Sequence, residues 1–511
     1  MQFSSAVFIL LFLPLALLVY FLSPGRRVKN VSLLLLSLGF YAWGDPTYVW
    51  LLVLAVLINW LLCLAMEHHA RDRGRARLLL ALAVVVNLGI LGFYKYQGFL
   101  AENLSSLTGL SIPSLDLPLP IGISYYTLRL VTYVVDVYRG QAKAQKTPLD
   151  LALYAAFFPA MVAGPIVRYA SFEPQLTSRR ETVPGFVSGA RLFAVGLSKK
   201  VLLSNVVAIL ADDMLSLGGA RIGLVGSWAG LIAYSMQLYF DFSGYSDMAL
   251  GISRMLGFDI EKNFNYPYIA RSVTEFWRRW HISLSSFFRD YVYIPMGGSR
   301  VSSSRLVLNL SVVWVLTGVW HGAAWNYIFW GVFYLLVLLG EKFVWGKLMS
   351  VAPKALQHLY VIVVFLLAWA LFWISDLGQL REYVLALFGT FGLLGKSTFW
   401  ELQAWSYLPV LAICVIAATP VVPWLRTNLR SWCAGERVPR HAEGVGPKDV
   451  SSSSLCDAEG YLGAGEASTR ARAAVWQVAT MAADLALLFL MALSVLSLVS
   501  GSFSPLIYFK F

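Results

Sequence analysis

Long apolar runs separated by short polar segments dominate the chain. The first run covers residues 6–22, and two more, 31–43 and 48–66, are separated by Gly44-Asp45-Pro46. A helix that crosses a bilayer needs about 20 predominantly apolar residues. Because a spanning segment must satisfy its backbone hydrogen bonds internally, we interpret these runs as membrane helices and predict an all-α, polytopic membrane fold.

Further apolar runs continue to the end of the chain. They cover residues 78–93, 121–137, 192–210, 229–256, 306–320, 325–339, 359–374, 408–418 and 482–499. The run 151–164 is shorter and breaks at Gly164-Pro165, which is typical of a segment buried within protein rather than lipid. At ~20 residues per span, the sequence predicts roughly eleven crossings.

One long polar stretch interrupts this pattern. Residues 426–472 are rich in Ser, Gly and Glu and have arginines near both ends. Such a composition favours a flexible linker. We therefore predict a helical membrane domain over 1–425, a flexible cytoplasmic loop over 426–472, and a last membrane helix of the same domain within 473–511.

The composition supports a membrane protein and excludes a soluble one. Hydrophobic residues make up 58% of the chain and charged residues 13%, about half of the ~25% usual in soluble domains. The net charge of +12 could indicate nucleic acid, but the basic residues lie mostly in short loops between apolar runs. By the positive-inside rule these loops predict orientation in the cytoplasmic membrane, with an extracytoplasmic N-terminus and no nucleic-acid partner.

The cysteines point to no metal or disulfide chemistry. Cys63, Cys414, Cys433 and Cys456 show no metal-ligand spacing, and the first two lie inside apolar runs. The sequence therefore supports neither a zinc site nor a disulfide framework.

Polar residues inside apolar segments are the informative ones. The segment 237–250 carries Tyr239, Asp241 and Asp247. The two carboxylates are six residues apart, which turns them ~240° from each other on a straight helix, so they do not form a paired acid–base site. Hydrogen bonding to neighbouring helices is the favoured interpretation, and lining a polar passage is the alternative.

A second polar segment is amphipathic. Residues 273–291 place apolar side chains at helical spacing, with Arg278, Arg279 and Arg289 on the opposite face. This pattern predicts one interfacial or re-entrant helix. His281 falls on its apolar side or border, where a packed, hydrogen-bonded histidine is the favoured interpretation and a functional one stays open.

The third polar segment, 316–326, contains His321 between two apolar runs. Gly318 and Gly322 form a small-xxx-small pair, which favours close helix packing. An ionisable side chain at membrane depth is costly and is a functional-site hypothesis by default. We therefore predict that His321 belongs to a functional site.

Three sequence blocks carry a family resemblance. They are QLYFDFSGYSDMALGISRMLG (Gln237–Gly257), FWRRWHISLSSFFRDYVYIPMG (Phe276–Gly297) and GVWHG (Gly318–Gly322). Shorter stretches that support them are Tyr41–Gly44, Phe93–Tyr96, Pro120–Ser124, Asp136–Arg139, Ala163–Pro165 and Ile507–Phe511. Together they resemble the membrane-bound O-acyltransferase family, and within it the alginate O-acetylation membrane proteins. Arg129 departs from the pattern, because relatives more often have an uncharged residue there.

The resemblance implies a helical membrane enzyme with a central passage. By resemblance, His321 corresponds to the family's catalytic histidine and His281 to a second, subfamily histidine. Asp241, Tyr239, Arg278 and Asn326 are candidates for lining the passage. The expected donor is acetyl-CoA or another acyl thioester in the cytoplasm, used as a substrate rather than a bound cofactor. The expected acceptor is an extracytoplasmic polysaccharide or an exported partner acetyltransferase.

Other functions remain open from the sequence alone. A related subfamily transfers D-alanine to teichoic acid, so the acyl group need not be acetyl. A transporter of acyl groups or polymer would also tolerate polar residues in its spans. A purely structural scaffold would not need His321 in such a setting.

Overall fold

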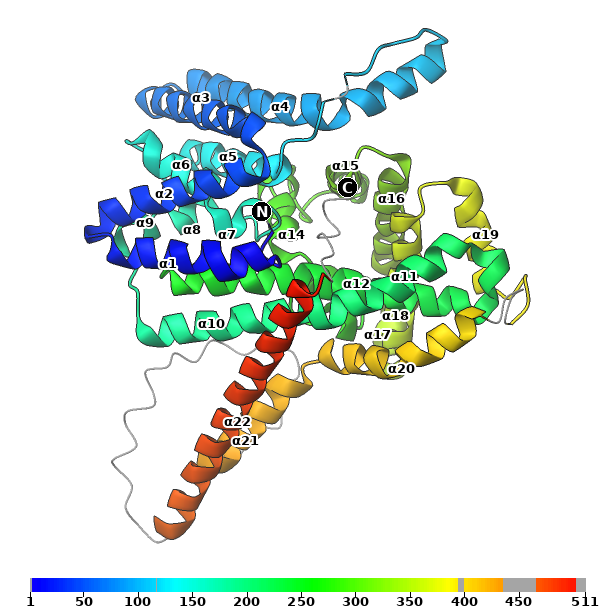
Figure 1. Ribbon diagram of the computed structural model, residues 1–511. Helices are drawn as coiled ribbons and strands as arrows, with labels where there is room; N and C mark the ends of the chain where they lie inside the picture. Colours follow the sequence, from blue (N-terminus) through cyan, green and yellow to red (C-terminus); the bar gives the residue numbers. More distant parts are fainter. Residues whose placement is uncertain (1, 116, 394–398, 435–465, 502–511) are drawn as a thin grey trace.

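A computed structural model describes residues 2–115, 117–393, 399–434 and 466–501 of the chain. In these ranges every regular element is a helix, as the all-α prediction requires. Figure 1 shows α1 to α10 stacked on one side of the molecule and α15 to α20 on the other, with the long helix α12 crossing from one group to the other and α10 and α20 below it in this view.

The first part of the chain supplies the stacked helices. Its elements are η1 (Phe8–Phe12), α1 (Leu13–Leu22), α2 (Gly25–Gly44), η2 (Pro46–Tyr48), α3 (Val49–His68), α4 (Arg73–Thr108), α5 (Ile123–Tyr138), α6 (Pro148–Ala156), α7 (Phe158–Met161), α8 (Tyr169–Phe172), α9 (Gln175–Ser178) and α10 (Val183–Ser198). The predicted break at Gly44-Asp45-Pro46 is confirmed, since α2 ends at Gly44 and proline starts the next turn.

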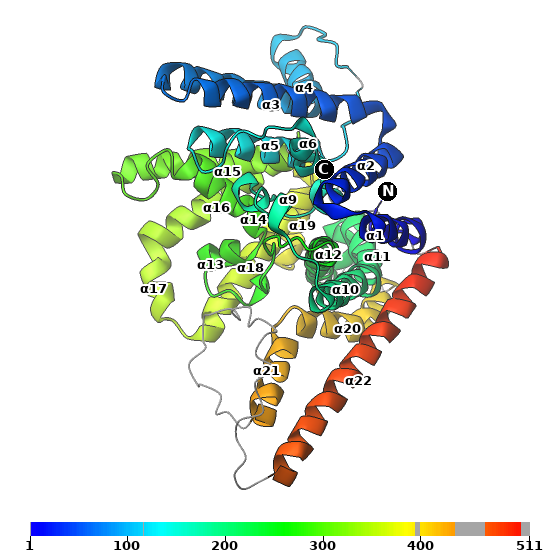
Figure 2. The same cartoon turned by 90° about the vertical axis from the view of Figure 1, so that its left-hand side faces the viewer.

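The rest of the chain forms the long central helix and the second group. Its elements are η3 (Lys199–Ser204), α11 (Asn205–Leu217), α12 (Gly219–Met255), η4 (Pro267–Ile269), α13 (Val273–Arg279), α14 (Ile282–Phe288), η5 (Arg289–Tyr293), α15 (Ser303–His321), α16 (Trp325–Gly340), η6 (Glu341–Trp345), α17 (Gly346–Val351), α18 (Lys354–Trp373), α19 (Leu377–Leu387), α20 (Phe399–Ala417), α21 (Val421–Ala434) and α22 (Glu466–Val499). In Figure 2, α21 and α22 extend away from the other helices.

The described helices confirm a polytopic membrane protein. Seven are long and apolar enough to cross a bilayer, or up to eight if the bent pair α20–α21 is one span. This criterion uses length and hydropathy alone, so a largely buried helix with polar residues, such as α12, does not meet it. The prediction of roughly eleven crossings therefore stays a prediction.

The predicted loop 426–472 is helical at both ends. Helix α21 continues to Ala434, and α22 begins at Glu466. Residues 435–465, which include Cys456, lie outside the described residues, as do Ile507–Phe511.

Helices α10 and α12 contact each other through glycines. A Cβ atom on Gly196 would lie 2.5 Å from the Gly244 carbonyl oxygen, and one on Gly189 would lie 2.5 Å from that of Gly251. From the first contact to the second, the position moves back by seven residues on α10 and forward by seven on α12. The helices therefore run antiparallel, with their backbones in contact. Only glycine permits this approach.

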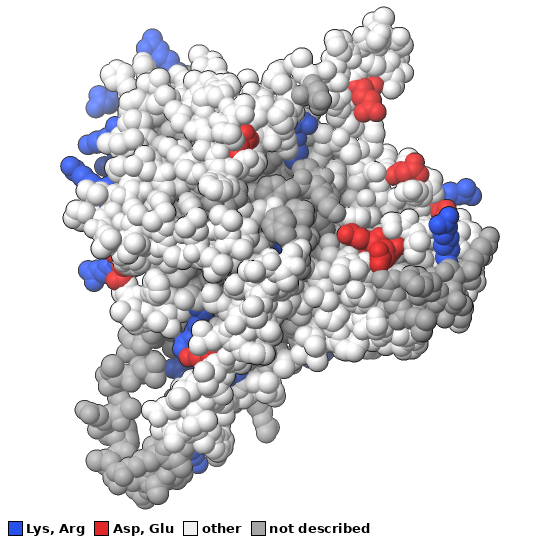
Figure 3. All heavy atoms as spheres, viewed as in Figure 1, with Lys and Arg blue, Asp and Glu red and all other residues white. Residues whose placement is uncertain are grey.

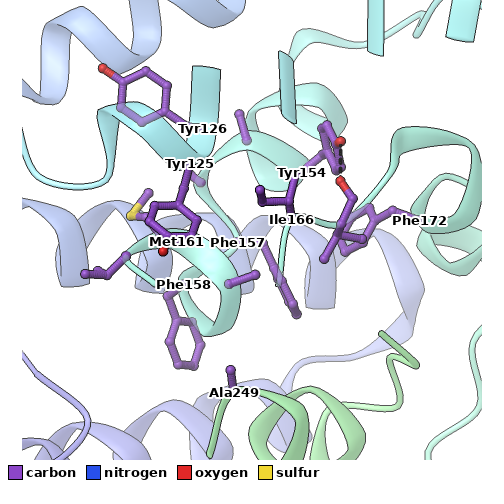
Figure 4. Close-up of a cluster of buried hydrophobic side chains, with 14 of the residues drawn as sticks. Tyr125, Tyr126, Tyr154, Phe157, Phe158, Met161, Ile166, Phe172 and Ala249 are labelled. Carbon is purple, nitrogen blue, oxygen red and sulfur yellow. Dashed lines mark hydrogen bonds between the residues drawn. The ribbon is translucent and has the colours of Figure 1, made fainter. Parts of the chain in front are cut away.

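Aromatic side chains fill the space between α5, α6 and α7. Figure 4 shows Tyr125, Tyr154, Phe157 and Phe158 in this cluster, and each is at least 95% buried. Their packing fixes α5, whose Tyr125 also contacts Trp320 with ring centroids 5.6 Å apart. The cluster therefore supports one wall of the region described next.

On the face of the molecule seen in Figure 3, most basic and most acidic side chains lie toward opposite ends. In Figure 3, Lys and Arg side chains line the left edge, over the ends of α1 to α4, whereas most visible Asp and Glu side chains lie toward the right. The gathering of Lys and Arg at one end is the pattern that the positive-inside rule describes. The orientation of the N-terminus stays a prediction.

Candidate active site

The amphipathic segment 273–291 is not one helix, and the prediction of a continuous helix is wrong. Helix α13 ends at Arg279 and α14 begins at Ile282, with His281 between them in the left-handed region (φ +45°, ψ +54°). A non-glycine residue in this region costs about 1–3 kcal/mol and persists only where its surroundings enforce it.

A neighbouring loop supplies the interactions that break the helix. The Asn263 carbonyl accepts the Ile282 N–H at 2.9 Å, and the Asn265 N–H donates to the Arg279 carbonyl at 2.9 Å. These bonds satisfy backbone groups that a continuous helix would have paired internally. The periodicity of the segment does not reveal them, because the partners lie elsewhere in the sequence.

Asn263 also orients the His281 ring. Its Oδ1 accepts the backbone N–H of Ser283 at 3.1 Å and lies 3.1 Å from His281 Nδ1. Because Oδ1 is fixed as an acceptor, Nδ1 must carry the hydrogen, and Nε2 carries the lone pair. His281 is 1% exposed, and this burial lowers its pKa to about 3, so the imidazole is neutral at physiological pH.

His321 is the last residue of α15, a candidate membrane span. The following Gly322 is extended and turns the chain toward α16. The predicted close packing at the glycines is confirmed: a Cβ atom on Gly318 would lie 2.5 Å from the Tyr327 carbonyl oxygen, and one on Gly322 would overlap the Tyr327 ring. The two helices therefore hold His321 at a tightly packed junction.

The two histidines come together at Trp320. The Trp320 ring centroid lies 5.7 Å from that of His281 and 5.0 Å from that of His321. Phe242 packs edge-on against His281 at 4.7 Å, and Trp330 against His321 at 4.8 Å. The structure thus places two buried imidazoles, 40 residues apart in the chain, in one aromatic environment.

A large basic cavity lies beside this pair. Its volume is about 1170 Å³, and Trp277 and Ile282 contribute to its wall. The charged side chains that line it are Arg271, Arg278, Arg289, Glu341 and Lys342. Neither histidine lines the cavity, but Trp277 packs on Trp330 with ring centroids 5.6 Å apart, and Trp330 packs on His321. The basic surplus makes the cavity suitable for an anionic ligand.

The four proposed lining residues lie in different places. Arg278 is exposed and lines the basic cavity. Asn326 is buried and donates from Nδ2 to the Phe372 carbonyl at 2.8 Å. Tyr239 packs between Tyr268 and Trp280. Asp241 forms a buried ion pair with Lys200.

The ion pairs of α12 agree with the favoured, structural interpretation of its carboxylates. Asp241 pairs with Lys200, and Asp247 pairs with Lys199 at 2.6 Å. Each carboxylate therefore has its own lysine from the π-helix η3, and the two do not form a joint acid–base site.

Sequence reasoning missed several residues around the site. Lys199 and Lys200 interrupt an apolar run, and this was a signal that each needs a partner. Lys95 lies in the apolar helix α4, and its Nζ donates to the Trp320 carbonyl at 2.6 Å. Asn263 gave no signal, because its partners are 18 to 20 residues away in an irregular segment.

Comparison with known proteins decides the family. A family model described as the membrane-bound O-acyltransferase family matches residues 35–377. The chain belongs to this family. The predicted resemblance is therefore confirmed, and the protein is a membrane-bound O-acyltransferase.

Individual relatives of this O-acyltransferase carry different substrate names. The chain is 36% identical over 522 residues to a probable alginate O-acetylase, AlgI, of Azotobacter vinelandii, with all of both chains covered. It is 32% identical to a peptidoglycan O-acetyltransferase of Helicobacter pylori, over 76% of this chain and 80% of the relative. A teichoic acid D-alanyltransferase of Bacillus subtilis is 32% identical over 44% of this chain and 60% of its own length.

Proposed function

We propose that this membrane-bound O-acyltransferase moves an acetyl group from a cytoplasmic acyl thioester to a hydroxyl of an extracytoplasmic polysaccharide. The observation that carries the proposal is the meeting of His281 and His321 at Trp320, beside a basic cavity. The names of two relatives, a probable alginate O-acetylase and a peptidoglycan O-acetyltransferase, support a glycan acceptor and an acetyl group.

In the proposed reaction, His321 acts as the general base. Its imidazole takes the proton of the acceptor hydroxyl while the oxygen attacks the acyl carbon. The thioester carbon–sulfur bond then breaks, and the thiolate leaves and takes up that proton, so the products are an ester and a free thiol. General-base catalysis of this kind contributes ~10²–10⁴-fold to the rate.

We assign a supporting role to His281. Its Nδ1 hydrogen is held by Asn263, so Nε2 carries the lone pair and is the nitrogen that can accept a hydrogen bond from the acceptor hydroxyl or from His321. Because this ring is neutral, it can relay a proton without placing a fixed charge beside the thioester. The His281 role is therefore orientation or proton relay.

The basic cavity is the proposed donor site. An acyl thioester of the coenzyme A type carries phosphates, and Arg271, Arg278 and Arg289 supply charge-assisted hydrogen bonds for them. The proposed orientation places the side with this cavity in the cytoplasm, with the N-terminus on the opposite side.

The test is a His321→Ala variant that still inserts into the membrane. Cells with this variant should lose the acetyl ester that mild base releases from the envelope glycan, as measured by mass spectrometry. His68→Ala is the matched control, because His68 is exposed at the end of α3. An unchanged amount of acetyl ester with His321→Ala would remove this residue from catalysis.

The same measurement identifies the acyl group, and an assay with purified protein identifies whether the glycan or a partner protein is the direct acceptor. Release of D-alanine instead of acetate would replace acetyl transfer by D-alanyl transfer. Purified protein incubated with radiolabelled acetyl-CoA and a glycan should form labelled glycan without a second protein. Transfer only when an exported acetyltransferase is added would make that partner the direct acceptor.

A further inference from the structure

A stripe on α4 faces the turn that joins α15 to α16. Lys95, Phe99 and Asn103 are four residues apart and so share one face of the helix. The first donates to the Trp320 carbonyl, and Tyr96 beside it donates its hydroxyl to the Val319 carbonyl at 2.6 Å. Helix α4 therefore holds the C-terminal carbonyls of the helix that ends at His321.

The other two residues of the stripe hold Trp325. Asn103 Oδ1 accepts the Trp325 indole N–H at 2.9 Å, and the Phe99 ring packs against the indole with centroids 5.7 Å apart. Trp325 is the first residue of α16 and follows His321 by four residues. Their Cα atoms are therefore no more than about 14 Å apart.

Trp325 is nonetheless half exposed. Its side chain is 51% accessible, and Phe329, one turn later, is 40% accessible, with the two rings stacked at 5.9 Å. The hydrogen bond to Asn103 fixes the indole, so its exposed surface is presented in one orientation. Two adjacent exposed rings in a fixed orientation form a platform rather than two mobile side chains.

The platform lies far from the basic end of the molecule. Along α4, the distance from Arg73 to Lys95 is about 33 Å at ~1.5 Å per residue, close to the ~30 Å thickness of the hydrocarbon core. Trp325 contacts the part of α4 beyond Lys95. It therefore lies toward the end from which an extracytoplasmic acceptor would approach.

We infer that Trp325 and Phe329 are a stacking platform for a sugar ring of the acceptor glycan, an inference that rests on the proposed function. The faces of a pyranose ring carry C–H groups, which pack on the electron-rich face of an aromatic ring. His321 and Trp325 lie at the two ends of the turn between α15 and α16, so a sugar stacked on the platform lies beside the turn that follows the proposed base. The platform thus sets which sugar along the chain is presented to the base.

Binding is tested on the full-length protein in detergent by saturation-transfer difference NMR. The probes are a hexamer of mannuronate, which is acidic, and chitohexaose, which is neutral. We expect saturation transfer to the ring C–H protons of at least one probe, a loss of at least fivefold in Trp325→Ala, and retention in Trp325→Phe. No transfer to either probe, or equal transfer in Trp325→Ala, would overturn the platform.

Trp43→Ala is the matched control. Trp43 is 65% exposed near the C-terminus of α2, and an exposed tryptophan can simply anchor a protein in the membrane interface. The control should bind the probes as the wild type does. An equal loss of binding in Trp43→Ala and Trp325→Ala would assign both to membrane anchoring and reject the platform.

Kinetics separate this inference from the proposed function. With acetyl-CoA as the donor and the bound hexamer as acceptor, Trp325→Ala should raise the KM for the glycan at least tenfold and leave the KM for the donor unchanged. Asn103→Ala should give a smaller rise in the same direction. If His321→Ala abolishes transfer but Trp325→Ala has no effect, only the platform fails. If both wild type and His321→Ala bind glycan but neither transfers acetyl, only the proposed function fails.

Discussion

Two neighbouring regions of this molecule bury polar side chains in opposite ways. Along α12, Asp241 and Asp247 are each neutralised by a lysine of η3. At the junction of α14 and α15, His281 and His321 are surrounded by aromatic rings, and the first of them is held by an amide. The fold tolerates a buried charge that is neutralised within the protein, whereas a neutral imidazole keeps a lone pair for chemistry.

The largest expected effect is the loss of stability when an ion pair of α12 is broken. Lys200→Met leaves Asp241 buried without its cation, which should destabilise the protein by ~3–5 kcal/mol. The double variant Lys200→Met/Asp241→Leu should recover most of this loss, because no charge is then left buried. Thermal unfolding of the purified protein in detergent measures both.

The transfer rate of the Lys200→Met molecules that remain folded also tests whether the ion pair contributes to function. Lys200→Met should lose stability while the remaining folded protein transfers acetyl at the normal rate. If the variant is folded but inactive, the ion pair belongs to the active site and the contrast between the two regions is wrong.

The next effect concerns the amide that holds His281. Asn263→Ala removes the acceptor of the His281 Nδ1 hydrogen and frees the ring to turn. We expect turnover to fall about 10²-fold, the usual cost of misplacing a reacting group by ~1 Å. Asn265→Ala is the control, since the described contacts of Asn265 use its backbone. If Asn263→Ala and Asn265→Ala have equal turnover, the positioning of His281 by Asn263 has no role in the reaction.

A smaller effect is expected at the basic cavity. Arg278→Gln removes one charge-assisted hydrogen bond, worth ~1.5 kcal/mol, which corresponds to about a tenfold higher KM for the acyl donor. The rate at saturating donor should not change. Arg300→Gln is the control, because Arg300 is exposed and is not among the residues that line the cavity. A loss of maximal rate with an unchanged KM would exclude the cavity as the donor site.

The smallest expected effect is a dependence of folding stability on pH, which comes from Glu181, outside the membrane helices. Burial by itself would raise the pKa of Glu181, but hydrogen bonds from Arg26 at 2.5 Å and Tyr20 at 2.6 Å outweigh it and lower the pKa to about 2. A carboxylate with a lowered pKa stabilises the fold above its unfolded pKa of ~4.3, and this stabilisation is lost as the pH falls toward 2.

The measurement is the unfolding midpoint at pH 5 and pH 3. The wild type should lose more stability between these values than Glu181→Gln, which has no carboxylate to protonate. Equal losses would show that the contacts of Glu181 do not depend on its charge.

The helical class and many helix boundaries followed from the sequence, because apolar runs and breakers are local signals. Pro46 marked the boundary between α2 and α3. Gly318 in α15 and Gly322 directly after it predicted close packing, and both contact α16. The sequence also indicated that His321 lies inside the protein, because an ionisable side chain between two apolar runs is costly to expose to lipid.

The break at His281 was not predictable from periodicity. The segment 273–291 has the spacing of a continuous helix, and only the loop at Asn263 shows why the helix stops. Lys95 was missed for a similar reason, since its role depends on where α15 ends in space. Local patterns determine which residues form helices, but contacts between distant segments determine where the site lies.

The glycine contacts between α10 and α12 restrict how this chain can change in length during evolution. One residue inserted between Gly189 and Gly196 would rotate the rest of α10 by about 100° and turn a larger side chain toward the backbone of α12. Length variation among homologous chains should therefore be absent between the two glycines of α10.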